Sequence, residues 1–337
     1  MKKDNLVSIK NVVKEFDISG GLIEQFKLRN NRIVREKTVV HALNNISLDI
    51  GRGETVSVVG ESGCGKSTLA RCVIRLHDIN GGEIHYAGNR IDNIDHNALK
   101  PYRTKMQMVF QDPYSSLNPR MSVESILQEP IRFHNPSYSK GDIIDKVAEV
   151  MQQVGIDPLW RTRFPHEFSG GQRQRISIAR ALAVDPEFIV ADEPIAALDV
   201  SIQAQVLNLM MDLQEERGLT YMFISHDLSV VEHISTEVAV MYLGSLCEFA
   251  ETETLYKDPR HPYTKALLSA IPQFGHKGFQ HLRLQGDVPT PIDLPPGCVF
   301  HGRCPYATKR CQTEIPQTLQ LDNGSMVACH GVEEQRI

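Results

Sequence analysis

Apolar and polar positions along the chain follow two periods, which together predict alternating strands and helices. Residues 6–16 alternate well enough to form an opening strand, and another strand is expected over residues 38–50. The polar stretch between them, residues 17–37, contains the turn signals Gly20-Gly21 and Asn30-Asn31. This stretch is therefore expected to be a surface insertion.

Four further apolar runs are expected to be buried strands, and each leads into a glycine loop or a polar residue. These runs are residues 55–59, 106–110, 188–191 and 221–224. Helices are expected within residues 122–155, where apolar side chains recur at helical spacing at Ile143, Ile144, Val147, Val150, Met151 and Val154. The pattern predicts an open α/β sheet, in which functional residues gather beyond the carboxyl ends of the strands.

Residues 60–68 contain the clearest chemical motif, because they fit G-x-x-x-x-G-K-[ST] between a predicted strand and a predicted helix. Glycines at 60, 63 and 65 let the backbone turn tightly and point its N–H groups at an anion. Lys66 is then expected to reach the β- and γ-phosphates of a nucleotide, and Ser67 to ligate Mg²⁺. A glycine-rich turn matching by chance is the alternative, and the strand-loop-helix context argues against it.

Two other segments have compositions that predict a loop and the start of a helix. Residues 112–119 are expected to be an exposed loop, because prolines and small polar residues interrupt regular structure there. Residues 169–172, Ser-Gly-Gly-Gln, precede a helix expected through Leu182. Paired glycines before a helix again expose N–H groups to an anion.

Composition sets limits on the class of protein. The 337 residues suffice for about two domains, with 41% hydrophobic and 23% charged residues. A net charge of -5 and a pI near 6.2 lack the basic footprint of a nucleic-acid-binding protein. No apolar run reaches the roughly 18 residues that span a bilayer, and no signal peptide is recognisable. We therefore expect a cytoplasmic protein that acts on membranes only through a partner.

Four of the seven cysteines gather near the C-terminus and form a candidate metal site, Cys298, Cys304, Cys311 and Cys329. Stable disulfides are not expected in the cytoplasm. The usual C-x-x-C spacing of structural zinc is absent, and four thiolates suit an iron–sulfur cluster. Zinc and uncoordinated thiols remain the alternatives.

The sequence resembles the ATP-binding subunits of ABC transporters, because it contains that family's motifs in the same order. These are residues 60–68 (the phosphate loop), Gln111, Ser169-Gly170-Gly171-Gln172, Asp192-Glu193, Asp199 and His226. The resemblance covers about residues 6–250. It implies an α/β ABC-type P-loop ATPase domain over residues 1–250, with a RecA-like core sheet, a helical subdomain at about 112–183 and an antiparallel β-subdomain. Residues 251–337 would form a small C-terminal accessory region.

The resemblance also implies a role for each matching residue. Catalysis would rest on Glu193, His226, Lys66 and Gln111, with Glu193 polarising the attacking water. Mg²⁺ would be held by Ser67, Gln111 and Asp192. ATP would be bound by Phe16, Gly60, Ser62, Gly63, Cys64, Gly65, Lys66, Ser67, Thr68, Gln111, Ser169, Gly170, Gly171, Gln172, Asp192 and Asp199. The residues at 169–172 would contact ATP held by a second subunit.

Residues 254–272 and 111–119 resemble the peptide and nickel importer group, most of all the second (F-type) ATPase subunit of dipeptide and oligopeptide systems. Partners implied are a second, homologous ATPase subunit, two transmembrane permease subunits and an extracytoplasmic peptide-binding protein. The chain would be peripheral on the cytoplasmic face of the inner membrane. Some subunits with this tail are described as carrying a [4Fe–4S] cluster.

Alternative interpretations of the sequence differ in the transported substrate or in the class of ATPase. Haem, glutathione and nickel are alternative cargoes for the same ATPase. A soluble ATPase acting on nucleic acid or ribosomes would typically carry a coiled coil or two fused ATPase domains, and neither pattern is found in the sequence. A regulatory module with negligible turnover is disfavoured by intact Glu193 and His226.

Overall fold

The computed structural model describes residues 4–19, 26–29, 32–35, 37–271 and 284–337. These residues group into two compact units that alternate along the chain. The first unit comprises residues 1–6, 50–57 and 93–236, and the second comprises residues 7–49, 58–92 and 237–337. The domain boundary expected near residue 250 falls inside the second unit.

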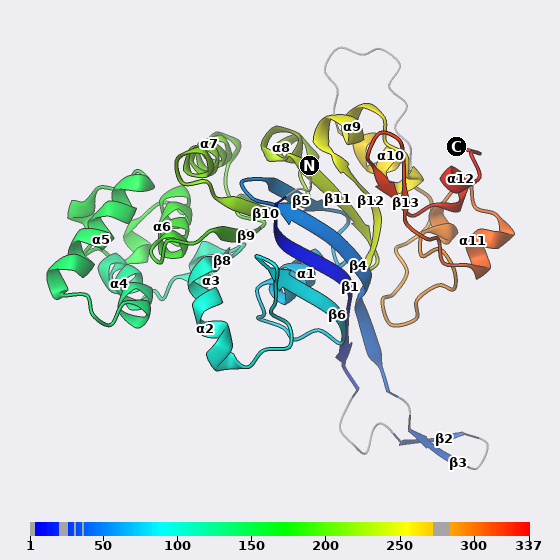
Figure 1. The fold of residues 1–337 in the computed structure, drawn as a ribbon, viewed down its shortest axis with the longest axis horizontal. Helices are drawn as coiled ribbons and strands as arrows, with labels where there is room; N and C mark the ends of the chain where they lie inside the picture. The colour runs from blue at the N-terminus through cyan, green and yellow to red at the C-terminus, as the bar shows by residue number, and fades with distance from the viewer. Residues whose placement is uncertain (1–3, 20–25, 30–31, 36, 272–283) are drawn as a thin grey trace. The chain divides into compact units, whose positions relative to one another are not determined.

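The first unit contains the strands β5, β10, β9 and β8, which are neighbours in that order (Figure 1). Its strands are β5 (Thr55–Val59, through Ser57 in this unit), β8 (Met106–Val109), β9 (Phe188–Asp192) and β10 (Thr220–Ile224). β9 is parallel to both β8 and β10. Every residue of β5, β9 and β10 is buried, as their continuous apolar sequences predict.

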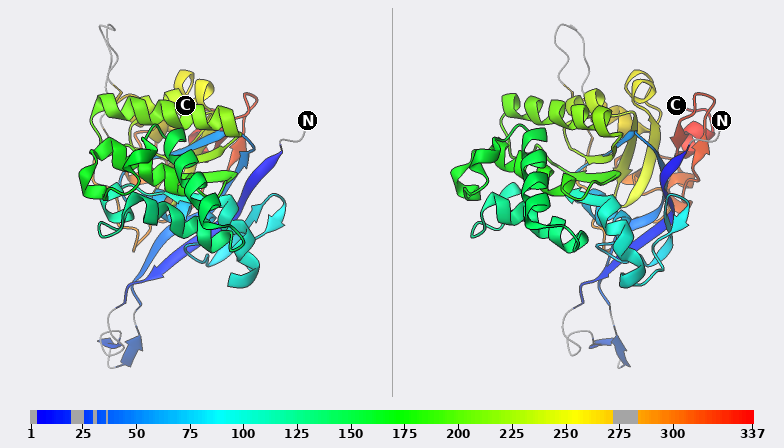
Figure 2. Two further views of the ribbon diagram at one scale, coloured as in Figure 1. Left: turned by 90° about the vertical axis from the view of Figure 1, so that its left-hand side faces the viewer. Right: turned by 60° about the vertical axis from the view of Figure 1, so that its left-hand side comes forward.

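Helices make up most of the rest of the first unit, and α4, α5 and α6 pack together in it (Figures 1 and 2). The α-helices are α2 (His96–Lys105), α3 (Pro113–Ser116), α4 (Val123–His134), α5 (Lys140–Gln153), α6 (Gly170–Leu182), α7 (Val200–Arg217) and α8 (Leu228–Ile234). Five of the six positions that predicted a helical core are buried. Ile144 is the exception, with 38% of its surface exposed.

The expectation of an irregular loop over residues 112–119 is wrong in part, because α3 forms there. Asp112 caps this helix by accepting hydrogen bonds from the N–H groups of Tyr114 and Ser115. Pro113 occupies the first helical position, where the missing proline N–H has no intrahelical partner to lose. An Asp-Pro pair therefore starts a helix here instead of preventing one.

The second unit contains two sheets and a hairpin. One sheet has the order β4-β1-β6-β7, with β1 (Asn5–Asp17), β4 (Val39–Gly51), β6 (Gly81–Tyr86) and β7 (Asn89–Arg90). The strands β13 (Leu319–Gln320), β14 (Met326–Val327), β12 (Ser245–Glu251) and β11 (Glu237–Tyr242) are antiparallel neighbours in that order. β1 and β4, at residues 5–17 and 39–51, agree with the two strands expected from the sequence.

The hairpin β2 (Phe26–Arg29) and β3 (Arg32–Arg35) lies within the expected insertion at residues 17–37. Both turn signals named for that insertion, at residues 20–21 and 30–31, lie outside the described residues. The helices of the second unit are α1 (Lys66–Val73), α9 (Thr252–Lys257), α10 (Pro262–Leu268), α11 (Lys309–Thr313) and α12 (His330–Glu333).

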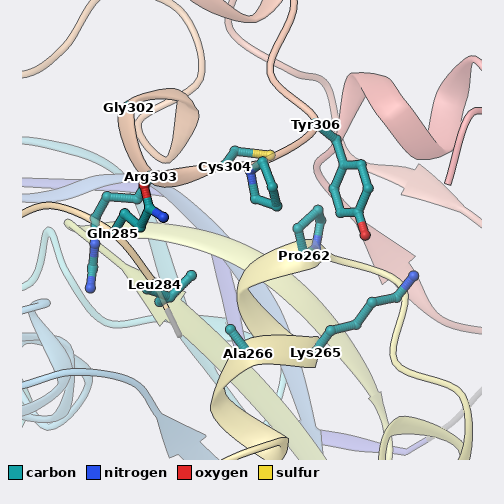
Figure 3. A pocket seen from close by; sticks show the side chains of 10 residues that line it. Pro262, Lys265, Ala266, Leu284, Gln285, Gly302, Arg303, Cys304 and Tyr306 are labelled. Atoms are coloured by element: carbon teal, nitrogen blue, oxygen red, sulfur yellow. The ribbon is translucent and has the colours of Figure 1, made fainter. Parts of the chain in front are cut away.

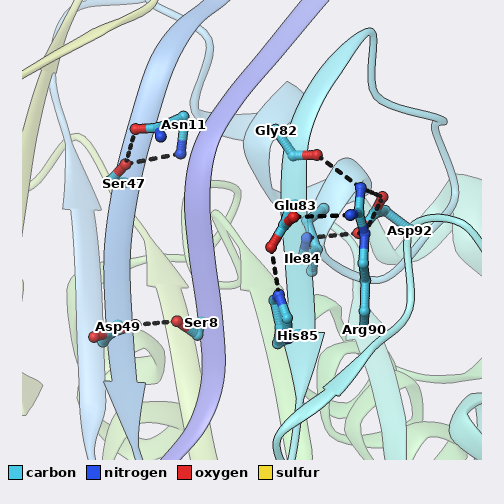
Figure 4. Close-up of polar contacts among 10 residues, drawn as sticks. All are labelled: Ser8, Asn11, Ser47, Asp49, Gly82, Glu83, Ile84, His85, Arg90 and Asp92. Atoms are coloured by element: carbon cyan, nitrogen blue, oxygen red, sulfur yellow. Dashed lines mark hydrogen bonds and ion pairs between the residues drawn. The ribbon is translucent and has the colours of Figure 1, made fainter.

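Polar pairs fix neighbouring strands of the β4-β1-β6-β7 sheet (Figure 4). Ser8 on β1 donates to Asp49 on β4, and the Asn11 N–H donates to the Ser47 hydroxyl at 2.8 Å. Beyond β7, Asp92 accepts from the Ile84 N–H at 2.8 Å and from the Arg90 guanidinium, holding β6 against the turn that follows it.

Residues after β11 add an aromatic core to the second unit. The rings of Tyr242, Tyr263 and Phe300 lie 4.8–5.4 Å apart between centroids, and each side chain is almost fully buried. Nearby, the Glu248 carboxylate accepts the N–H groups of Arg260 and His261, and burial raises the pKa of this carboxyl. The C-terminal segments thus pack on strands β11 and β12 instead of forming a core of their own.

Two helices of the first unit begin with the same reciprocal cap. On α6, the Ser169 hydroxyl accepts the Gln172 N–H at 3.3 Å, and the Gln172 side chain accepts the Ser169 N–H at 3.0 Å. On α5, Ser139 and Asp142 make the equivalent pair at 3.2 and 2.8 Å. Each box satisfies two N–H groups that a helix start otherwise leaves without a partner.

Replacing Ser169 by alanine is expected to lower the free energy of unfolding by about 1 kcal/mol, the usual cost of a lost serine cap. Ser139→Ala is the matched variant and should cost a similar amount, whereas Ser169→Asn, which keeps a capping oxygen, should cost much less. Urea unfolding followed by circular dichroism measures all three. A loss for Ser139→Ala with none for Ser169→Ala would show that the α6 cap contributes no stability.

Candidate functional site

The glycine motif forms the turn between β5 and α1, and its backbone requires glycine at two positions in particular. Gly60 has φ of 147° and Gly65, the residue before α1, has φ of 103°. A Cβ on Gly60 would lie 2.1 Å from the Met241 carbonyl oxygen, and one on Gly65 would lie 2.4 Å from the Ala42 carbonyl oxygen. Both the dihedral angles and the close backbone approach exclude larger residues.

Lys66 places its ammonium group inside this turn. The Nζ atom donates to the carbonyl oxygens of Gly60 at 2.7 Å and Glu61 at 3.0 Å, and the residue is only 6% exposed. Cys64 is also buried, and burial raises the pKa of its thiol. By contrast, Ser62 and Gly63 are exposed at the tip of the loop. Two backbone carbonyls thus hold the Lys66 ammonium within the loop, where the motif predicts that a phosphate binds.

Glu61 receives two contacts from the C-terminal part of the second unit, which the motif does not predict. Its carboxylate accepts two hydrogen bonds from the Arg303 guanidinium, at 2.6 and 3.0 Å. Its backbone N–H donates to the Tyr263 hydroxyl at 2.9 Å. The sequence contains no signal that these residues meet, because more than 200 positions separate each of them from Glu61.

Phe16, expected to stack on adenine, lies near the end of β1 and is partly buried. Its ring and that of His77 pack at a steep angle with centroids 5.5 Å apart, and the Lys14 ammonium lies 4.7 Å from the Phe16 ring centre. Ser67 and Thr68 are the second and third residues of α1 and are partly buried.

Three of the predicted catalytic side chains meet at the carboxyl ends of β8, β9 and β10 in the first unit. The Gln111 amide donates to a Glu193 carboxylate oxygen at 2.9 Å, and His226 Nδ1 lies 3.3 Å from that oxygen. The Glu193 side chain is 19% exposed and the His226 side chain 64%. A carboxylate held by an amide and an imidazole at the rim of the sheet is well placed to accept a proton or orient a water molecule.

The Glu193 backbone adopts an unusual conformation for a residue with a side chain, with φ of 48°. Its N–H donates to the carbonyl of Ile224, the last residue of β10, at 3.0 Å. Left-handed backbone is unfavourable for non-glycine residues and recurs at functional sites. Here it turns the chain sharply after β9, immediately beyond the buried Asp192.

Asp199 caps α7 within the same unit. Its carboxylate accepts the Ile202 N–H at 3.0 Å and the Ser201 hydroxyl at 2.8 Å, and these hydrogen bonds lower its pKa. Within the Ser169–Gln172 segment, Gly171 approaches α7 closely, since a Cβ there would lie 2.4 Å from the Ile202 side chain. These helix starts therefore pack together closely, and Ser169 at the start of α6 is exposed.

The four C-terminal cysteines gather in one region, as their effects on one another's pKa values indicate. Burial, together with the nearby Cys329, Cys311 and Cys304 thiols, raises the pKa of the Cys298 thiol to about 11. None of the seven cysteines forms a disulfide. Among the described residues, however, no three His, Cys, Asp or Glu side chains are arranged to hold a metal ion.

A cavity of about 310 Å³ lies beside this region, within the second unit (Figure 3). Its walls combine the side chains of Lys265, Arg303 and Cys304 with apolar groups that include Pro262 and Tyr306. Elsewhere, no helix in the described parts of the chain combines the length and apolar character that crossing a membrane requires.

Comparison with known proteins accounts for both the ATPase motifs and the C-terminal segments. The family "ABC transporter" matches residues 43–196, and the family "Oligopeptide/dipeptide transporter, C-terminal region" matches residues 247–311. The oligopeptide transport ATP-binding protein AppF of Bacillus subtilis (strain 168) is 48% identical over 332 residues, which make up 97% of this chain and 98% of that protein.

The dipeptide transport ATP-binding protein DppF of Escherichia coli (strain K12) is 50% identical over 297 residues, or 88% of each chain. Among solved structures, the dimeric post-hydrolysis state of the ATP-binding cassette MJ0796, bound to ADP and Pi, matches with a TM-score of 0.62. It is 27% identical and covers 73% of this chain and 98% of that one. The chain therefore belongs to the ABC transporter family, as an ATPase of the oligopeptide and dipeptide transport group with the α/β P-loop fold expected from its sequence.

Proposed function

We propose that this ATPase powers the import of dipeptides or oligopeptides through a membrane complex. The observation that carries the proposal is the Gln111–Glu193–His226 cluster, because it supplies a base for hydrolysis in a chain whose relatives are named as peptide transport ATP-binding proteins. A subunit that only bound nucleotide would not need this cluster. Other cargoes of the same machine are outcomes of the experiments below.

In the proposed reaction each predicted site residue has its own role in binding or hydrolysing ATP. Lys66 and the glycine-loop N–H groups bind the phosphates, while Ser67, Asp192 and Gln111 would hold Mg²⁺. Glu193 accepts a hydrogen bond from the attacking water, and His226 orients the γ-phosphate. Phosphoryl transfer depends chiefly on such positioning and charge stabilisation, so these residue types suffice.

A second ATPase subunit completes the site in this proposal. Ser169 at the start of α6 is exposed, and the helix N-terminus beneath it favours a phosphate. We infer that Ser169, Gly170, Gly171 and Gln172 contact the ATP held by the partner's phosphate loop, with Asp199 nearby. The solved structure of the similar cassette MJ0796 is described as dimeric. In this group we favour pairing with a homologous rather than an identical chain.

The surface proposed for the permease subunits is the segment from Gln111 to Val123. Its helix α3 exposes the Tyr114 ring, which is 62% accessible to solvent, while the Arg173 guanidinium stacks on it at 3.8 Å from the ring centre. Because Arg173 belongs to α6, a partner that moves Tyr114 also acts on the helix that carries Ser169. The subunit would therefore sit peripherally at the cytoplasmic face of the inner membrane.

Glu193→Gln is expected to lower kcat for ATP hydrolysis by about 100- to 1,000-fold, because the amide cannot act as a base. The Kd for Mg-ATP should change little, since the amide keeps the size of the carboxylate. Steady-state phosphate release and equilibrium binding of labelled ATP measure the two effects.

Glu187→Gln is the matched control, because Glu187 precedes β9 and its carboxylate pairs with Arg52 and Lys105 away from the cluster. It should retain wild-type hydrolysis. Hydrolysis by Glu193→Gln at the wild-type rate would rule out Glu193 as the base.

Capture of the chain from native membranes is expected to recover two polytopic subunits and a second, related ATPase. The proteoliposome-reconstituted complex with its external binding protein should take up a labelled dipeptide only with hydrolysable ATP. Uptake of haem, glutathione or nickel without peptide uptake would contradict the proposed peptide cargo. Recovery of ribosomal or DNA-repair proteins without permeases would contradict the proposed role in transport.

We also propose that Cys298, Cys304, Cys311 and Cys329 bind a [4Fe–4S] cluster. Four thiols in one region provide the right donor atoms, although in the described geometry no three of them are arranged to hold a metal. Such a cluster would stabilise the C-terminal region, whose described residues form no hydrophobic core of their own.

Anaerobically purified protein is expected to contain about four irons per chain and to be brown. Cys311→Ser should lose this iron, whereas Cys72→Ser, at a buried cysteine of α1, should keep it. Colourless, iron-free protein, or one zinc per chain, would contradict the cluster.

A further inference from the structure

All three polar groups of Glu61 are engaged by hydrogen bonds. Its carboxylate accepts two hydrogen bonds from Arg303, and its N–H donates to the Tyr263 hydroxyl. Its carbonyl accepts a hydrogen bond from the Lys66 ammonium at 3.0 Å. Glu61 thereby links the C-terminal part of the second unit to the lysine of the phosphate loop. A shift of Glu61 would move one of the two carbonyls that orient Lys66.

The two C-terminal partners of Glu61 are rigidly mounted. Tyr263 is fully buried, with its ring centroid 4.8 Å from that of Tyr242 and 5.4 Å from that of Phe300. Arg303, in the turn after Phe300, keeps only 9% of its side chain exposed and lies over the Tyr242 ring. The same aromatic core therefore fixes both groups that hold Glu61.

The Arg303–Glu61 pair also controls charge at the phosphate loop. A carboxylate one residue beyond Gly60 would repel the phosphates of a nucleotide and attract the Lys66 ammonium. Arg303 neutralises it through two parallel hydrogen bonds, a geometry that lysine does not reproduce. Arg310 is different, because it pairs with Glu314, Glu333 and Glu334 within the C-terminal segments.

We propose that Arg303 and Tyr263 are positioning residues for ATP binding, which hold Glu61 and mask its charge so that Lys66 and the loop are ready for phosphate. The C-terminal region is then part of the nucleotide site's support and not an appendage. This inference rests on the proposed role of residues 60–68 in binding ATP.

The test measures Kd for Mg-ATP and the kinetics of hydrolysis on full-length variants. Arg303→Ala is expected to raise the Kd and KM for ATP about tenfold, the scale of a lost charge-assisted contact, with kcat at saturating ATP nearly unchanged. Tyr263→Phe, which removes only the hydroxyl, should raise Kd by a smaller factor of about three.

Rescue distinguishes charge masking from general damage. Adding Glu61→Gln to Arg303→Ala removes the unmasked charge and should recover most of the ATP affinity. Arg310→Ala, the matched arginine variant, should bind ATP as the wild type does. Unchanged affinity in Arg303→Ala, equal weakening in Arg310→Ala, or failure of Glu61→Gln to restore affinity would each overturn the proposal.

Two further variants cover the remaining outcomes. If Arg303→Ala does not fold, Arg303→Lys and Tyr263→Phe carry the test, and wild-type ATP affinity in both would overturn it. Lys66→Ala examines the loop itself. Loss of ATP binding there with no effect at Arg303 would refute only the positioning role, whereas ATP binding retained by Lys66→Ala would refute the proposed role of the loop.

Discussion

The register of three parallel strands determines the chemistry of the first unit. Val109 on β8 pairs with Ala191 on β9, and Asp192 pairs with Ile224 on β10. Gln111 follows Val109 by two residues and Glu193 follows Ala191 by two, so both lie at the same distance along the sheet. His226 likewise follows Ile224 by two residues. A slip of one residue in either pairing would turn these side chains to opposite faces of the sheet, so the burial of β8, β9 and β10 also fixes the geometry of the proposed catalytic cluster.

The strands of the first unit and the helices α4, α5 and α6 could be predicted because their sequences are locally unambiguous. Continuous apolar runs specify β5, β9 and β10, and the Ser-Gly-Gly-Gln segment leads directly into α6. The sequence does not predict the short helix α3, because Asp112-Pro113 is typical both of a loop and of a helix start. A short sequence is compatible with both a helix and a loop when the same residues can cap a helix and interrupt one.

Contacts between distant segments could not be predicted in the same way. Neither the glycine motif nor the cysteine spacing indicates that Arg303 meets Glu61, since that pairing depends on how Tyr263 and Phe300 pack on β11. The left-handed backbone at Glu193 is equally hidden, because nothing in an apolar strand ending in two carboxylates reveals a positive φ. Both features arise from tertiary packing, which overrides local preference.

The cap of α6 limits which groups of the Ser169–Gln172 segment can donate hydrogen bonds to a nucleotide. In the described geometry the Ser169 hydroxyl and the Gln172 amide oxygen are occupied by each other's backbone N–H groups. The hydroxyl can keep accepting the Gln172 N–H while donating its own hydrogen to a phosphate oxygen, but the Gln172 oxygen has no proton to offer an anion. A bound phosphate would therefore use the Ser169 hydroxyl, the Gln172 amide NH₂ and the glycine N–H groups, and each charge-assisted bond supplies roughly 1.5–3 kcal/mol. Because the cap can persist, binding need not unwind the helix start that presents these donors.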